Sequence, residues 1–158
     1  MTFWQWLLFR FINFWPPYLG AGIRLKRLAR DCSEAEVEMK LRWWNTNYVG
    51  VHFGGSLYAM TDPFYMLIAM ERFRLKGWLG DYVIWDKAAT IRFKRPGRGT
   101  VRAHFKLTDQ QLEELKNTAD REGKAEAIYP VQVVSESGEV VAEVEKTLYL
   151  RKKTRTPN

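Results

Sequence analysis

The chain has 158 residues and 46% of them are hydrophobic, so it is long enough to bury a core of its own as one domain. Its formal net charge of +7 favours anionic partners, such as a membrane surface or a phosphorylated ligand. With Cys32 as its only cysteine and two histidines, the chain cannot form an internal disulfide or the usual zinc ligand sets unaided. No metal or other cofactor is predicted.

The N-terminal segment from Phe3 to Trp15 is almost wholly apolar. A helix of this length extends only ~20 Å, which is shorter than the ~30 Å hydrocarbon core of a bilayer. Two interpretations stay open: the segment docks on the protein or its dimer mate, or residues 3–15 lie in a membrane interface beside basic residues. These basic residues are Arg24, Lys26, Arg27 and Arg30. We expect residues 1–30 to form a helical extension.

Hydrophobic periodicity predicts the elements that follow. Apolar and charged residues alternate from Ala35 to Trp43, which indicates a strand. Apolar residues from Leu57 to Phe73 recur at helical spacing, which predicts a long apolar helix ending near Gly77. Apolar and polar residues alternate again from Tyr82, and a second alternating stretch runs from Val101 to Leu107. We interpret these two strands as a hairpin that turns at residues 96–99.

The last third of the chain predicts a short helix and two more strands. Thr108 and Gln111 have the spacing of a capping box, so a helix should run from there to about Asn117. Strands follow at about residues 125–134 and 140–150, and Pro130 suggests an edge or a bulge in the first of them. About five antiparallel strands around one apolar helix make an α+β domain over residues 31–151, followed by a basic tail at 152–158.

Chemistry concentrates at the start of the predicted long helix, where Gly54 and Gly55 stand at its mouth and the carboxylate of Asp62 lies further along the same element. Adjacent glycines let the backbone approach a ligand, and free N–H groups at a helix start attract an oxyanion. Asp62 could act as a base or a nucleophile on a ligand held there. The alternative is structural: Asp62 before Pro63 is also a helix-start signal, with the aspartate as N-cap. We expect Asp86, inside a predicted strand, to be structural or ion-paired.

The spacing of this segment resembles the hotdog-fold acyl-CoA thioesterases of the phenylacetyl-CoA thioesterase type. The residues that carry the resemblance are Asn47, Gly50, Gly54, Gly55 and Asp62. The longer sequence segments at 52–63 and 83–89 resemble those of an uncharacterised branch of hotdog thioesterases. The resemblance implies a hotdog fold and hydrolysis of an acyl-CoA or acyl-carrier-protein thioester. It also implies that Asn47 orients the water or thioester, that the glycines hold the oxyanion, and that Asp62 is catalytic.

The chain departs from this signature at one position. Phe53 stands where the family has a histidine, and His52 lies one residue earlier. Neighbouring residues do not point the same way, so His52 should not inherit the missing role. We therefore keep His52 and Ser56 only as weaker site candidates.

The distance between the glycines and the aspartate predicts a shared site. Gly54 and Asp62 would lie ~12 Å apart along one helix, too far to contact one carbonyl from a single chain. Two antiparallel copies of the helix across a twofold axis would bring Gly54 of one chain close to Asp62 of the other. We therefore expect a homodimer or a dimer of dimers, as the resemblance also implies.

Basic residues populate the polar side and turn of the predicted hairpin. They are Arg92, Lys94, Arg95, Arg98, Arg102 and Lys106. They form either a solvated sheet face or a cradle for the phosphates of coenzyme A, with Arg95 and Arg98 best placed at the turn. Nucleic acid is not an expected partner, because this face lacks interleaved aromatic residues.

Two other functions remain open. Phe53 and the apolar N-terminal segment favour a non-catalytic module that binds acyl-CoA or lipid. A hydratase or dehydratase would need a histidine in the site, and only His52 and His104 are available. The single cysteine and the lack of a signal or spanning segment predict a cytoplasmic protein, with peripheral contact at the inner membrane as a further option.

Overall fold

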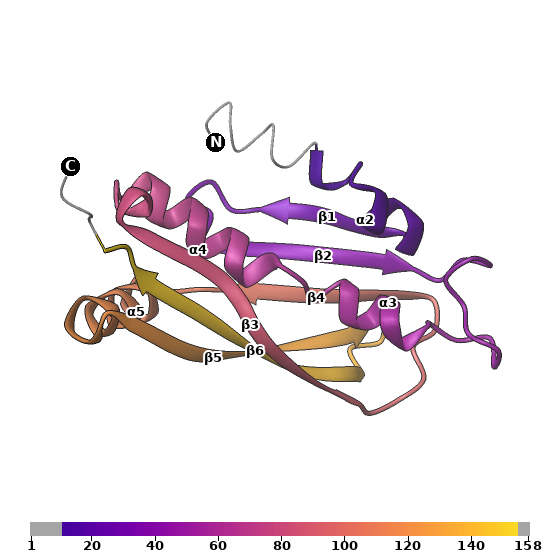
Figure 1. Ribbon diagram of the computed structural model, residues 1–158. Coiled ribbons are helices and arrows are strands. Elements are labelled where there is room, and N and C mark those ends of the chain that lie inside the picture. The colour runs from indigo at the N-terminus through magenta and orange to yellow at the C-terminus, as the bar shows by residue number, and fades with distance from the viewer. Residues whose placement is uncertain (1–10, 155–158) are drawn as a thin grey trace.

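A curved antiparallel sheet packs around helix α4 in the computed structural model, which describes residues 11–154 (Figure 1). The sheet has six strands in the order β1-β2-β4-β5-β6-β3. The strands are β1 (Ile23–Leu28), β2 (Glu34–Lys40), β3 (Tyr82–Phe93), β4 (Thr100–Lys106), β5 (Lys124–Ser135) and β6 (Val140–Lys152). The helices are α2 (Pro16–Ala21), α3 (Gly54–Ala59), α4 (Phe64–Leu75), the 3-10 turn η1 (Leu79–Asp81) and α5 (Asp109–Glu122).

Helix α4 supplies the centre of the core. Phe64, Tyr65 and Phe73 are almost completely buried. The ring of Phe105 on β4 lies 5.1 Å from that of Phe64 and 5.2 Å from that of Tyr65, measured between centroids. Burying each of these large side chains contributes about 1.5–3 kcal/mol. The α+β class predicted from periodicity is therefore confirmed, with the apolar helix against the inner face of the sheet.

The N-terminal prediction needs correction. Residues 23–28 form strand β1, which pairs with β2, so the helical extension expected over residues 1–30 does not hold there. Ile23 and Leu25 face the core while Arg24 and Lys26 face outward, and this alternation is too short to stand out beside the basic run. The side chain of Asn13 bonds to the backbone N–H and carbonyl of Leu25, at 2.7 and 3.1 Å, on the outer edge of the strand. Residues 3–10 of the apolar segment lie outside the described part.

The predicted hairpin over residues 82–107 is wrong. β3 pairs with β6 at one end of the sheet, and β4 pairs with β2 and β5. The connection crosses the end of the sheet: Lys94 N–H donates to Val141 O, and Leu41 N–H donates to Gly99 O. Because the connection crosses the sheet, β4 lies beside β2. The two strands pair antiparallel over seven residue pairs, from Glu34↔Lys106 to Lys40↔Thr100.

Pro130 lies in an interior strand, but at a place where that strand is paired on one side. The ladder between β4 and β5 covers only Val101 to Ala103 opposite Val133 to Ser135. Elsewhere in residues 11–154, β5 pairs with β6 alone, so a residue without an N–H is tolerated at position 130. Tyr65 donates its hydroxyl to the carbonyl of Pro130 at 2.6 Å.

Both predicted helices are present, with changes to their extent. The capping box of Thr108 and Gln111 is present, and α5 continues past the expected end at Asn117 to Glu122. α4 ends at Leu75, two residues before Gly77. The long helix is broken into α3 and α4 by residues 60–63. Within residues 11–154, each helix is too short or too polar to cross a bilayer.

Candidate active site

The break between α3 and α4 places Asp62 at the centre of the site. Pro63, which lacks an N–H, occupies the N-cap position of α4, and the Asp62–Pro63 peptide is cis. The hydroxyl of Tyr18 donates to the carbonyl of Asp62, and Thr61 Oγ1 donates to Tyr58 O at 2.8 Å. Asp62 is therefore not the N-cap of α4, contrary to the structural alternative, and its carboxylate is directed elsewhere.

That carboxylate pairs with a buried lysine. Asp62 Oδ1 accepts a hydrogen bond from Lys146 Nζ at 2.8 Å. Lys146 is only 1% exposed, whereas the side chain of Asp62 is 45% exposed. The ammonium also lies 3.1 Å from Asp86 Oδ2 and 5.7 Å from the ring centroid of Tyr58. Asp62, Lys146 and Asp86 form what we call the carboxylate–lysine cluster, contributed by the helix break, β6 and β3.

Burial sets the protonation of this cluster. Burial alone would lower the pKa of Lys146, but the hydrogen bond to Asp62 and the charge of Asp86 outweigh it and raise the pKa. Lys146 therefore stays an ammonium near neutral pH. Burial raises the pKa of Asp86 to about 6, against the opposing charge of Lys146. Burial and the charge of Asp62 also raise the pKa of Tyr18, so its hydroxyl remains a donor.

Lys146 was not among the residues singled out from the sequence, although a signal was present. Val144, Leu148 and Leu150 form the inward row of β6. Lys146 occupies a position in that apolar row, and a lysine there must be paired or deprotonated. Asp86 has the same place on β3, two residues after the buried Ile84. Its expected ion pair is present.

The two glycines begin α3 on the other side of the break. The N–H groups of Ser56 and Leu57 bond to the carbonyl of Phe53, so those of Gly54 and Gly55 precede the first helical bonds. A Cβ on Gly54 would lie 3.1 Å from the ring of Phe93, and one on Gly55 would overlap the ring of Phe53. Only glycine fits these positions without rearrangement. Phe53 is 55% exposed beside them.

Of the three polar candidates near the glycines, His52 and Asn47 have structural partners and Ser56 is buried. His52 is buried, its Nε2 lies 3.1 Å from Gly99 O, and burial lowers its pKa. Asn47 Oδ1 accepts from the N–H groups of Val49 and Val51, so its carboxamide oxygen holds its own loop. Ser56 is buried in the first turn of α3. In this structure, none of the three makes a hydrogen bond to Asp62, Lys146 or Asp86.

The basic residues of the presumed hairpin separate in the structure. Arg102 pairs with Glu38 at 3.1 Å, and Lys106 pairs with Glu34 at 2.8 Å, across the β2–β4 ladder. Arg95 pairs with Glu139. Arg98 is exposed on the crossing connection, next to Gly97, whose carbonyl accepts from the N–H of His52. The bond between His52 and Gly97 places Arg98 close to the residues that precede α3.

Comparison with known proteins decides the family. Residues 5–150 match the family described as "Domain of unknown function (DUF4442)". The chain belongs to this family. No curated protein matches this DUF4442 chain at a significant level.

Solved structures give the fold of the DUF4442 chain. A Pseudomonas aeruginosa protein described as a probable thioesterase has 24% identity, covering 94% of this chain and 96% of its own, with a TM-score of 0.77. The thioesterase HI1161 of Haemophilus influenzae has 14% identity over 100% and 97% of the two chains, with a TM-score of 0.67. The PaaI protein of E. coli, from the phenylacetic acid degradation operon, has 18% identity over 97% and 94%, with a TM-score of 0.63. The hotdog fold is thereby confirmed.

Removing the charge of Lys146 should destabilise the protein strongly. Lys146→Met would leave Asp86 buried without its cation, and breaking a buried pair typically costs about 3–5 kcal/mol. Urea denaturation measures the change in the free energy of unfolding. The double variant Lys146→Met with Asp86→Asn should recover part of the loss. Lys87→Met is the control: Lys87 pairs with Glu126 but is half-exposed, so its loss should cost less than about 1 kcal/mol. If Lys146→Met and Lys87→Met lose similar amounts of stability, Lys146 is not a buried, paired cation as described.

Asp86 should make stability depend on pH. Its pKa is raised from 3.8 to about 6, so the folded chain holds this proton more tightly than the unfolded chain. This stabilisation is fully present below about pH 4 and is lost as the pH rises through about 6. Asp86→Asn lacks the titration, so its free energy of unfolding relative to wild type should rise by up to about 3 kcal/mol between pH 4 and 7.5. Denaturation series at several pH values measure this difference; a constant difference would refute the prediction.

Proposed function

We propose that this protein hydrolyses an acyl thioester, carried by coenzyme A or an acyl-carrier protein, with Asp62 as the reacting carboxylate. The observation that carries the proposal is the carboxylate of Asp62 itself. It is half-exposed, ion-paired to the buried Lys146, and lies three residues after the short helix α3, which begins with Gly54 and Gly55. Proteins of similar fold are described as thioesterases, which supports the same reaction class.

The proposed reaction uses Asp62 as a general base. Asp62 removes a proton from water while the water oxygen attacks the thioester carbonyl carbon. The N–H groups of Gly54 and Gly55 hold the oxyanion that develops. The C–S bond then breaks, and the thiolate leaves and takes up the proton, giving a carboxylic acid and a free thiol. Attack by Asp62 itself, through an anhydride that water then opens, is the second form of the same reaction.

Other residues have supporting roles in the proposal. Lys146 orients Asp62 and balances its charge. Arg98 is the better candidate for a phosphate of coenzyme A, because Arg95 already has a carboxylate partner in Glu139. Asn47 can still orient water through its amide nitrogen, since its oxygen is engaged within the loop.

The two alternative functions differ in their support. A non-catalytic acyl-CoA or lipid-binding module is favoured by Phe53 at the family's histidine position. A hydratase or dehydratase has less support, because each histidine is committed elsewhere: His52 to Gly99 O, and His104 to Glu34, 3.4 Å away on the β2–β4 ladder. Neither histidine is bonded to the carboxylate–lysine cluster.

The proposed site includes a second protomer. Within residues 11–154, β3 pairs on one side only, with β6, and its other edge is free to pair. Exposed apolar residues flank the glycines, namely Phe53, Tyr58 and Phe93. A twofold pairing would cover both features and bring the glycines of one chain towards Asp62 of the other.

Assembly is measured by light scattering after size exclusion. We expect a mass at least twice the 18.6 kDa of the chain at micromolar concentration, because an unpaired edge and an apolar rim favour association. A clean monomer would contradict the shared site.

Asp62→Asn should abolish hydrolysis. The amide keeps the shape of the side chain but cannot accept a proton, so turnover should fall by about 10²–10⁴-fold. Thiol release from a panel of short, medium, long and aromatic acyl-CoAs measures the rate. Glu145→Gln, one residue from Lys146 but exposed, is the control and should keep wild-type turnover.

Wild-type protein that hydrolyses no member of the panel, yet binds acyl-CoA saturably in calorimetry, would overturn the enzyme proposal in favour of the binding module. Full activity of Asp62→Asn would overturn the role of the carboxylate. Its melting temperature should stay within a few degrees of wild type, because Asp86 still pairs with Lys146.

A further inference from the structure

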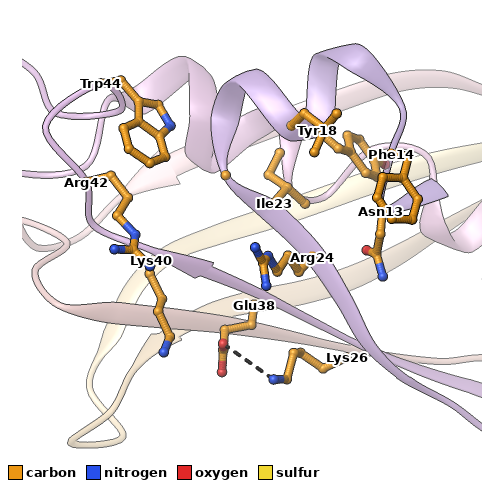
Figure 2. Close-up of a pocket in the computed structure, with 12 residues that line it drawn as sticks. Asn13, Phe14, Tyr18, Ile23, Arg24, Lys26, Glu38, Lys40, Arg42 and Trp44 are labelled. Carbon is orange, nitrogen blue, oxygen red and sulfur yellow. Dashed lines mark ion pairs between the residues drawn. The ribbon is translucent and has the colours of Figure 1, made fainter. Parts of the chain in front are cut away.

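A cationic cavity of about 590 Å³ lies between α2 and the first two strands (Figure 2). Four cations line it: Arg24 and Lys26 from β1, Lys40 from the end of β2, and Arg42 from the loop that follows. Aromatic walls are contributed by Phe14, Tyr18 and Trp44. Figure 2 shows Arg42 and Lys40 at the left, Arg24 and Lys26 nearer the centre, and Tyr18 and Phe14 at the upper right.

The charge of this cavity is not balanced by the protein. Among the described residues that line it, Glu38 is the only one with a carboxylate, and it already pairs with Arg102 at 3.1 Å and Lys26 at 3.9 Å. Within residues 11–154, no ion pair is formed by Arg24, Lys40 or Arg42. Three cations that share one cavity repel each other unless an anion lies between them. The cavity is therefore suited to a phosphate or another compact anion.

An apolar hollow of about 480 Å³ adjoins the cationic cavity. Phe11, Phe14, Trp15, Pro63 and Leu67 line it together with two neighbours. Phe14 lines both spaces and is 63% exposed, and Phe11, Trp15 and Leu19 are also exposed. Exposed aromatic residues beside cations are typical of surfaces that enter the headgroup layer of a membrane.

The aromatic segment is held in place rather than loose. Both polar atoms of the Asn13 side chain bond to the backbone of Leu25, so the segment is fixed along the edge of β1. The rings of Trp15 and Tyr18 contact edge to face, with 5.2 Å between centroids. The segment that carries the exposed rings is therefore attached to β1, the strand that carries Arg24 and Lys26.

We propose that this surface binds an anionic phospholipid at a membrane: the headgroup phosphate occupies the cationic cavity, and the rings of Phe11, Phe14 and Trp15 enter the interface beside it. A soluble anion would require the cations but gains nothing from an exposed apolar hollow. A second copy of the chain would cover the rings but would leave three like charges together. A phospholipid satisfies both halves of the surface. The proposal does not depend on thioester hydrolysis.

Vesicle sedimentation tests the proposal with the full chain. Wild type should bind vesicles of equal parts phosphatidylglycerol and phosphatidylcholine, release them as salt rises, and leave pure phosphatidylcholine vesicles unbound. Each basic residue near an anionic surface contributes about a fivefold gain in affinity, so Arg24→Gln, Lys40→Gln and Arg42→Gln together should weaken binding about 100-fold. Phe14→Ser should weaken it about tenfold.

A matched control separates this surface from net charge alone. Arg121, Lys124 and Arg151 are exposed cations at the ends of α5 and β6 and the start of β5. Changing these three to Gln removes the same charge and should alter binding by less than about threefold. Thermal melting of every variant confirms that it folds.

Three results would overturn the proposal. Equal losses in the two triple variants would reduce the effect to net charge. Tight calorimetric binding of inorganic phosphate by a protein that ignores anionic vesicles would make the cavity a site for a soluble anion. A Phe14→Ser variant that changes oligomeric state but binds vesicles like wild type would make the aromatic surface an interface between copies.

Discussion

The ion pairs of Lys146 constrain the site and the elements around it. An ammonium that is 1% exposed is tolerated only when paired, and its two partners come from β3 and from the break between α3 and α4. Those contacts connect β3 at the end of the sheet, its neighbour β6, and the break between α3 and α4. The two carboxylates differ, since the side chain of Asp62 is 45% exposed and that of Asp86 only 11%. Unequal environments are how paired carboxylates acquire separate roles.

Sequence periodicity predicts where the helices and strands lie better than it predicts which strands pair with each other. The inward rows of β2, β4, β5 and β6, the apolar face of α4 and the cap at Thr108 all depend on local patterns, and these were predicted. The order of strands depends on where a connection goes, and residues 94–99 have no local feature that distinguishes a tight turn from a crossing of the sheet. β1 was missed because its alternation is short and its outward residues are basic.

The candidate site was predictable at Asp62 and the glycines, because spacing and resemblance both point there. The expectation for Asp86 required only its place inside a strand, and its pairing followed from burial. Lys146 required a different question, namely which polar residue interrupts an apolar row. His52 shows the opposite limit, since its neighbours in sequence say nothing about Gly97 and Gly99, which bury it from the far side of the crossing connection.

The attachment of Asn13 to β1 has a consequence for how copies of this chain can assemble. An open sheet has two free ends, and a chain that can pair at both can propagate without limit. Here the backbone of Leu25 is already occupied by a side chain, and the register of β1 shifts between Leu25 and Arg27. The β1 end of the sheet is thus interrupted by the side chain of Asn13, whereas the strand at the other end, β3, is 12 residues long and has a register shift of its own between Asp86 and Ala88. If copies pair at β3 as proposed, assembly would stop after one twofold pairing, because the β1 end has no uninterrupted backbone edge for a further copy.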